Sequence, residues 1–298
     1  MKRVPDGFMI MAERKDKMKY NLALLAKEMK HSILPGAYQY IASGLGYEIS
    51  FDICNVEEEH LPEMVRELKE TRNGFTVTMP YKVRIMDYCD DLDESAQKCG
   101  SANTVLVNDG KLTGFNTDGW GLVKCLGLKG IDFKGKKVAM AGAGGVALSI
   151  AYNLLINDVE KVSVVNKYPE ETDRLVTRMG DKFTAFPLTE EGLCEASKDA
   201  DIYINASVLG QLGFDDYSTF AFLDQLKKDA VIYDVNYANP DAKLVKEARA
   251  KGFVCYIGNT MSALQGVRAM EIWTGDRLDN QKALQMMEMV EGGQLKVC

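Results

Sequence analysis

The chain has 298 residues, 46% apolar and 27% charged, which is the composition of a globular protein long enough for two domains. Its net charge of -7 argues against a nucleic-acid partner, because binding phosphates requires a basic surface. No apolar run is long enough to span a membrane, and the five-residue apolar patch at 8–12 is too short for a signal peptide. We therefore expect a cytoplasmic protein with a small-molecule substrate, as a monomer or a homodimer.

The cysteines and histidines indicate neither a disulfide framework nor a metal centre. Seven cysteines are scattered without a C-x-x-C pair, and the chain has only two histidines, His31 and His60. An odd and dispersed set of cysteines is typical of free thiols in a reducing compartment. A histidine-rich metal centre would need more imidazole groups than this chain has.

The first 128 residues alternate between strand-like and helix-like segments. Runs of β-branched and apolar residues predict strands at 20–25, 48–56, 74–79 and 102–107. Amphipathic segments predict helices at 35–45, 57–71, 81–98 and 119–128. This alternation is typical of an α/β fold with a mostly parallel sheet.

The rest of the chain repeats the alternation more regularly. Short apolar runs, typical of buried parallel strands, lie at 136–141, 161–166, 201–206, 230–235 and 253–257. Helix-like segments separate them, as crossover connections between parallel strands require. The last forty residues, 259–298, look helical only.

A glycine-rich turn follows the strand predicted at 136–141. Its residues Gly142, Gly144 and Ala147 match G-x-G-x-x-[GA], with Gly145 inside the motif, and a helix follows directly. In this context the glycines allow a tight turn and let a pyrophosphate approach the free N–H groups at the helix N-terminus. The alternative is that the glycines only allow close packing of the helix on the sheet.

Two glycine-containing segments, near 119 and near 258, are candidate domain boundaries. We expect a substrate-binding and catalytic domain at 1–118, to which residues 259–298 return. Residues 119–258 would form a doubly wound, Rossmann-type dinucleotide-binding domain. A cleft between two such domains is the usual ligand site.

The end of the second Rossmann strand bears on the choice between NAD and NADP. An NAD enzyme usually has an acidic residue there, whereas this chain has Asn166 followed by Lys167. A cation beside the ribose suits the 2′-phosphate of NADP, but Glu170 and Glu171 follow closely and would repel it. The pattern therefore favours NADP slightly and leaves NAD open.

A lysine stands at the end of a predicted strand in N-G-F-T-V-T-M-P-Y-K, residues 73–82. Lys82 follows Pro80, and Asp118 follows a second strand-like segment, so both can meet at the carboxyl edge of one sheet. A lysine next to a carboxylate is a sensible acid/base group for an alcohol dehydrogenase. The alternatives are that Lys82 is a solvated charge and that Asp118 only caps a helix.

Several further motifs accompany these two residues. They are S-A-N-T at 101–104, N-T-D-G at 116–119, N-A-S-V-L-G at 205–210 and G-N-T-M-S-A-L-Q-G at 258–266. Together with the lysine segment and the glycine turn, their order from about residue 31 to 275 resembles the shikimate/quinate dehydrogenase family. The resemblance covers most of the chain and rests on several independent motifs.

The resemblance implies roles for particular residues. The family's catalytic lysine and aspartate correspond to Lys82 and Asp118. The residues that would contact substrate are Ser32, Thr78, Asn103, Tyr237 and Gln265. Ala206 and Gly258, in the last two motifs, are candidate cofactor contacts beside Gly142, Gly144, Gly145, Ala147, Asn166 and Lys167. Ser32 could instead cap the helix that follows it, and Asn103 and Gln265 could be buried amides that satisfy loops.

The resemblance also implies an activity, namely NAD(P)-dependent oxidation of a ring hydroxyl of shikimate, quinate or a related compound, in aromatic amino acid biosynthesis. Leu34 departs from the family, which has a serine there that binds the substrate carboxylate. Leu148 departs as well, because NADP-specific members have an arginine at that position. The same chemistry on another substrate therefore stays open, as do a folate dehydrogenase-like enzyme and a ligand sensor of the same fold.

Overall fold

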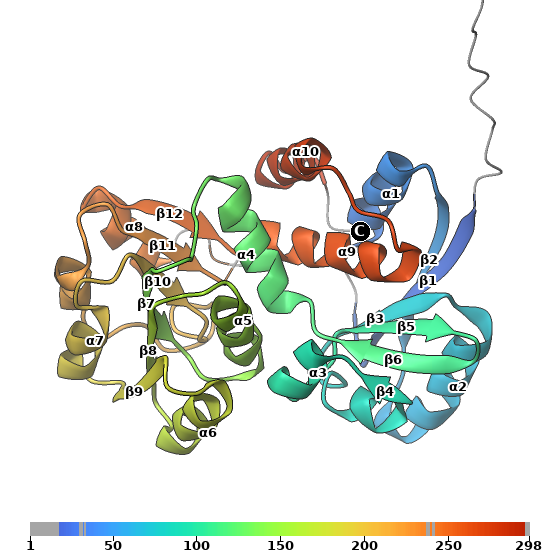
Figure 1. Cartoon of the computed structure of the whole chain (residues 1–298), viewed down its shortest axis with the longest axis horizontal. Helices are drawn as coiled ribbons and strands as arrows, with labels where there is room; N and C mark the ends of the chain where they lie inside the picture. The colour runs from blue at the N-terminus through green and yellow to red at the C-terminus, as the bar shows by residue number, and fades with distance from the viewer. Residues whose placement is uncertain (1–17, 30–31, 33, 237–238, 240–241, 296–298) are drawn as a thin grey trace, which may run out of the picture.

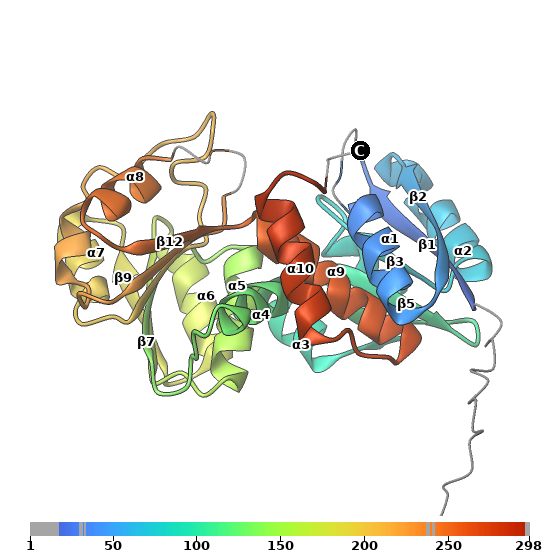
Figure 2. The same ribbon diagram turned by 90° about the horizontal axis from the view of Figure 1, so that it is seen from above.

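The computed structural model describes residues 18–29, 32, 34–236, 239 and 242–295. Two six-stranded sheets lie side by side, and helices α4 (Asp118–Leu128) and α9 (Asn259–Thr274) run between them (Figures 1 and 2). Within the described residues, no helix is long and apolar enough to cross a membrane. The six cysteines that the structure describes are free thiols, as expected.

The first sheet has the strand order β2-β1-β3-β5-β6-β4. Its strands are β1 (Lys19–Ala26), β2 (Glu48–Asn55), β3 (Gly74–Val77), β4 (Asp91–Leu92), β5 (Thr104–Asn108) and β6 (Lys111–Phe115). β5 runs antiparallel to both β3 and β6, whereas the other neighbouring pairs are parallel, so the sheet is mostly parallel, as expected, with one antiparallel strand. Because of this arrangement β3 and β6 point the same way, and their carboxyl ends lie at the same edge.

The helices of the first half are α1 (Leu34–Leu45), α2 (Leu61–Thr71) and α3 (Glu94–Cys99). The single helix predicted at 81–98 is wrong. That segment contains turns, a short 3₁₀ helix at Arg84–Tyr88, strand β4 and then α3. Asp93 accepts a hydrogen bond from Ser95 N at 2.9 Å and so starts α3 as its N-cap, which separates it from the residues before.

The second sheet is parallel throughout, with the order β12-β11-β10-β7-β8-β9. Its strands are β7 (Lys137–Ala141), β8 (Lys161–Asn166), β9 (Phe183–Pro187), β10 (Ile202–Asn205), β11 (Val231–Asp234) and β12 (Val254–Ile257). Its helices are α5 (Gly145–Ile156), α6 (Pro169–Met179), α7 (Glu190–Ser197), the 3₁₀ helix Ala221–Gln225 and α8 (Lys243–Ala250). The strand order reverses at β7, which is the doubly wound pattern of a Rossmann fold.

The last two helices pack beside the first sheet. Figure 2 shows α9 and α10 (Asn280–Glu291) next to α1. Trp273 of α9 donates its indole N–H to Val105 O of β5 at 2.9 Å, and its ring lies over Gly74 of β3, where a Cβ would lie 2.1 Å from it. The chain thus leaves the first sheet at α4 and returns to it through α9.

One apolar core continues across the junction of the two sheets. It includes Tyr38 of α1, Leu122 of α4, Ile150 of α5, Leu264 of α9 and Met286 of α10, all fully buried. A large apolar contact of this kind limits the relative motion of the two parts. The carboxyl edges of the two sheets are therefore held in a defined relation to each other.

Candidate active site

Lys82 and Asp118 meet at the carboxyl edge of the first sheet. Lys82 follows β3 through a turn anchored by Tyr81, whose hydroxyl donates to Val56 O at 2.6 Å. Asp118 follows β6 and is the first residue of α4. The Lys82 Nζ donates to Asp118 Oδ2 at 2.7 Å, and their side chains are only 22% and 8% exposed. This lysine is therefore not a freely solvated charge, and the arrangement has the geometry of an acid/base pair.

The side-chain amide of Asn103 connects this pair to α9. Its Nδ2 lies 2.8 Å from Asp118 Oδ1 and 2.7 Å from Gln265 Oε1. Its Oδ1 accepts from the backbone N–H of Thr117 at 2.8 Å. Thus Lys82, Asp118, Asn103 and Gln265, which come from four separate segments, form one hydrogen-bonded group. One hydrogen bond joins the two amides, and both structural and substrate-binding roles fit this geometry.

The other residues expected to contact substrate do not belong to this hydrogen-bonded group. Thr78 follows β3 directly, is partly exposed and lies on the same segment as Lys82. The Ser32 hydroxyl accepts from Leu34 N at 3.1 Å, a local hydrogen bond to the first residue of α1. Leu34 is buried and lies near Gly266, the residue after Gln265. Tyr237 lies outside the described residues.

The glycine turn between β7 and α5 has space for a phosphate. Gly142 adopts φ +107°, and a Cβ there would lie 2.5 Å from Ala206 O, so only glycine fits. Around Gly144 and Gly145, by contrast, no described atom lies within 4 Å of a Cβ position. No described side chain caps the start of α5, and its first N–H groups therefore face open space. This turn fits the pyrophosphate of a dinucleotide.

The other expected cofactor contacts are partly explained by packing. Ala147 is fully buried in the helix. Ala206 follows β10 and donates its N–H to Ala141 O at 2.8 Å, which places it beside the glycine turn. A Cβ on Gly258 would lie 2.0 Å from Val235 O, so this glycine lets α9 begin against the end of β11. Their positions at the sheet edge are compatible with cofactor contact.

The carboxylate of Glu171 lies at the end of β8, whereas the sequence showed only that this residue follows the strand closely. Asn166 Nδ2 donates to Glu171 Oε2 at 3.0 Å, so Glu171 reaches back from α6 to the strand end. Lys167 is exposed, and its Nζ lies 5.8 Å from the centre of the Tyr168 ring. A carboxylate here suits a ribose hydroxyl and repels a 2′-phosphate, whereas the lysine attracts one. Glu171 and Lys167 therefore have opposite effects on the binding of a 2′-phosphate.

A buried network beside the glycine turn was missed by the sequence analysis. Asp234 at the end of β11 is fully buried, and its Oδ1 accepts from Asn205 Nδ2 and Asn236 N, each at 3.0 Å. Asn236 in turn donates to Ser207 O and Leu209 O, and so fixes the loop at 205–210. Burial raises the pKa of the Asp234 carboxyl to about 6, against the hydrogen bonds from Asn236 and Asn205, which lower it. The sequence offered one signal for this network, namely that an asparagine stands at or just after the end of two adjacent strands, Asn205 at β10 and Asn236 after β11.

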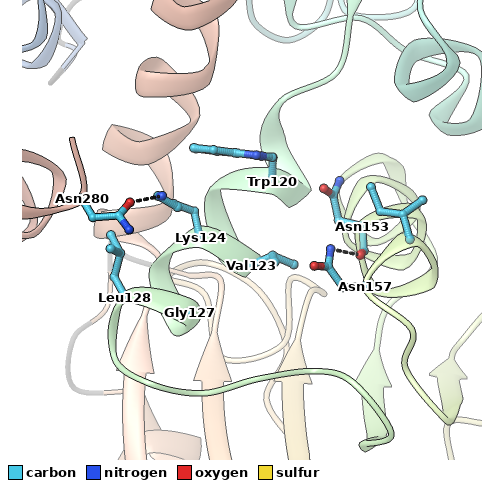
Figure 3. Close-up of a pocket in the computed structure, with 9 residues that line it drawn as sticks. Trp120, Val123, Lys124, Gly127, Leu128, Asn153, Asn157 and Asn280 are labelled. Atoms are coloured by element: carbon cyan, nitrogen blue, oxygen red, sulfur yellow. Dashed lines mark hydrogen bonds between the residues drawn. The ribbon is translucent and has the colours of Figure 1, made fainter. Parts of the chain in front are cut away.

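A cavity of about 430 Å³ lies between α4, α5 and α10 (Figure 3). Trp120 forms one side, and Lys124 donates to Asn280 Oδ1 at 2.6 Å within it. Most of its lining comes from the C-terminal halves of α4 and α5, away from Asp118 and from the glycine turn. Helix C-termini present carbonyl groups, which disfavour a phosphate, so this cavity does not suit the cofactor.

Comparison with known proteins identifies the family. Residues 24–105 match the model of the shikimate dehydrogenase substrate-binding domain, and residues 126–240 match the model of shikimate / quinate 5-dehydrogenase. The chain belongs to the shikimate dehydrogenase family. The resemblance noted in the sequence, the α/β fold class and the Rossmann-type sheet are confirmed.

Relatives of this family match the chain over nearly its whole length. A shikimate dehydrogenase (NADP(+)) from Alkaliphilus metalliredigens is 32% identical over 261 residues, which covers 86% of this chain and 91% of the relative. A Listeria monocytogenes shikimate 5-dehydrogenase, solved with shikimate and NAD, has a TM-score of 0.82 at 27% identity, covering 90% of this chain and 96% of that one. The Thermus thermophilus enzyme, solved with NADP(H) and shikimate, has a TM-score of 0.76 at 28% identity, covering 91% and 99%.

Proposed function

We propose that this chain is an NADP-dependent shikimate dehydrogenase, which transfers a hydride reversibly between the nicotinamide and a ring hydroxyl of shikimate. The observation that carries the proposal is the contact of 2.7 Å between Lys82 and Asp118, within the group that includes Asn103 and Gln265. The names of the relatives support both the substrate and NADP. The reaction would belong to aromatic amino acid biosynthesis.

The two parts of the chain would bind different molecules. Residues 1–118 with 259–298 would bind substrate, and residues 119–258 would bind the cofactor. The open N–H groups around Gly144 and Gly145 would hold the pyrophosphate, and the end of β8 with Asn166 and Lys167 would face the adenosine ribose. When bound, NADP supplies the hydride acceptor.

The proton of the substrate hydroxyl would be handled by Lys82. During oxidation, the Lys82 amine takes the proton from the hydroxyl oxygen while the hydride leaves the carbon that bears this hydroxyl. During reduction, the Lys82 ammonium returns the proton to the oxygen. The Asp118 carboxylate, 2.7 Å from Nζ, holds this nitrogen in one direction. Thr78, Asn103 and Gln265 would bind the hydroxyls of the ring, with Asn103 and Gln265 exchanging their mutual hydrogen bond for bonds to substrate.

Other functions receive less support. The relatives favour shikimate over an unrelated substrate, although Leu34 reduces the donors available to a carboxylate at the start of α1. A ligand sensor would not need a lysine held against a carboxylate in a group of satisfied polar side chains. The chain would act in the cytoplasm as a monomer or a homodimer.

The test is an absorbance assay at 340 nm with shikimate and quinate, each with NAD and NADP. We expect the fastest turnover with shikimate and NADP. Lys82→Ala should lower kcat by about 10²-fold or more, since it removes the acid/base group. Lys111→Ala is the matched control, because Lys111 is an exposed lysine at the opposite end of β6. Unchanged turnover in Lys82→Ala, or cofactor binding without turnover in the unmodified protein, would refute the proposal.

A further inference from the structure

A buried serine connects α5 to the start of α4, where Asp118 lies. Ser149 lies in the second turn of α5, one turn after Gly145, and is fully buried. Its hydroxyl accepts from Gly119 N at 2.7 Å and donates to Asn116 Oδ1 at 2.7 Å. Asn116 lies between β6 and α4, and Gly119 is the second residue of α4, so Ser149 joins α5 both to the segment that follows the first sheet and to the start of α4.

The two partners of Ser149 flank Asp118. Asn116 Oδ1 also accepts from Asp118 N at 3.2 Å, and Asn116 Nδ2 donates to Ser101 O at 3.0 Å. Gly119 is the residue after Asp118. The backbone around Asp118 is therefore held from the first sheet through Ser101 and from α5 through Ser149.

The Ser149 hydroxyl donates outside its own helix. A serine inside a helix commonly donates to the carbonyl one turn earlier, in its own helix. Here its proton is directed instead across the interface, to Asn116. The helices also touch at this point: a Cβ on Gly119 would lie 2.1 Å from Ser149 O, so the backbones of α4 and α5 are in direct contact (Figure 1).

This geometry points to Ser149 as a positioning residue for the reaction. It fixes Asp118, and through it Lys82, relative to the helix whose N-terminus would hold the pyrophosphate. The distance between the acid/base pair and the cofactor is then set by two short hydrogen bonds rather than by loop packing alone. The inference rests on the proposed function, because it requires Lys82 and Asp118 to act on the substrate.

Ser149→Ala tests the inference by removing both hydrogen bonds with little change in volume. We expect kcat to fall by about ten-fold or more, because small misplacements of catalytic groups are costly, while KM for NADP changes less than about two-fold. The matched control is Ser197→Ala. Ser197 is also fully buried on a helix beside the second sheet, but its hydroxyl has no hydrogen-bond partner among the described residues. The control should keep the kcat of the unmodified enzyme.

A double-mutant cycle separates positioning from general loss of structure. If Ser149 acts through Asp118, the substitution should lower kcat much less in an Asp118→Asn background than in the unmodified enzyme. Equal losses in both backgrounds, or an unchanged kcat in Ser149→Ala, would overturn the inference. Ser149→Cys, which keeps the volume and weakens both hydrogen bonds, should behave like Ser149→Ala and replaces it if the alanine variant does not fold.

The proposed function and this inference can fail separately. Full activity in Lys82→Ala would refute the proposed role of the acid/base pair itself. Collapse of activity in Lys82→Ala together with normal kcat in Ser149→Ala would leave the proposed function in place and reject only the positioning role.

Discussion

At the scale of single residues, the sequence predicted which groups would gather but not how they are joined. Lys82 and Asp118 each follow a strand-like segment, and parallel strands that share an edge bring such residues together. The bridge from Asn103 to Gln265 spans 162 positions, and no local pattern connects residues that far apart. The contact of Glu171 with Asn166 was likewise hidden, because it depends on how α6 starts after β8.

The carboxyl of Asp234 leads to a prediction about stability and pH. Its pKa is raised from 3.8 to about 6, chiefly because the carboxyl is buried. The folded protein therefore holds a proton that the unfolded chain has lost between about pH 4 and 6, and the stability due to this group falls as pH rises through that window. The shift corresponds to about 3 kcal/mol.

Asp234→Asn removes this cost, because the amide stays neutral and its Oδ1 can still accept from Asn205 and Asn236. We expect the variant to have a higher Tm than the unmodified protein at pH 7.5, and a smaller advantage at pH 4.5. Thermal unfolding of both proteins across this range measures the difference. Asp229→Asn, which changes an exposed carboxyl just before β11, serves as control. A constant difference at every pH would contradict the prediction.

At the scale of elements, the sequence was most informative where strands are buried on both faces. The five strands expected between residues 136 and 257 all appear in the second sheet, because a short continuous apolar run bounded by turns is typical of a strand covered on both faces. β9 was missed because Ala185 and Pro187 are exposed, so this strand has no continuous buried run. The bounds of β6 were not predicted, although Asp118 was expected to follow a strand-like segment; Asp109 and Gly110, both with positive φ, form the turn of its hairpin with β5.

The glycine turn allows a contrast between two neighbouring substitutions. Gly144→Ala meets no described atom within 4 Å and keeps an allowed φ of −75°, so Tm should change little. Its methyl group would occupy the space in front of α5, and KM for NADP should rise by about ten-fold or more.

Gly142→Ala should behave in the opposite way, because its φ of +107° and a contact of 2.5 Å with Ala206 O make any side chain costly. We expect it to lower the stability by about 1–3 kcal/mol. Thermal unfolding and cofactor titration of both variants distinguish the two effects. If Gly144→Ala unfolded early and still bound NADP normally, the turn would not be the phosphate site.

At the scale of the whole molecule, the sequence predicted a return of residues 259–298 to the first part from the absence of strands after 258, and α9 and α10 pack beside α1 of the first part. The way in which the return is achieved could not be read from the sequence. It depends on Trp273 filling the space above Gly74, and on one apolar core that extends from α1 to α5. Such packing is set by three-dimensional fit, which periodic patterns do not encode.

The junction between α4 and α9 is where this packing reaches the catalytic group. A Cβ on Gly121 would lie 2.5 Å from Met261 O and 3.0 Å from Gln265 N. Gly121→Ala must therefore push α9 away from α4, and α4 starts at Asp118 while α9 carries Gln265. We expect a loss of about 1–3 kcal/mol in stability together with a fall in kcat, because both ends of the polar group move.

Gly127→Ala is the matched control, since it lies in the same helix and meets no described atom within 4 Å. That change should stabilise the protein by about 0.5–1 kcal/mol, the usual gain when alanine replaces glycine inside a helix, and leave kcat unaltered. Thermal unfolding and the 340 nm assay on the two variants provide the comparison. If Gly121→Ala lowered Tm but kept kcat, the α4–α9 contact would support the fold without setting the geometry of Asp118 and Gln265. If Gly121→Ala lowered both Tm and kcat, the close approach of α4 and α9 at this glycine would be what keeps Asp118 and Gln265 in their relative positions.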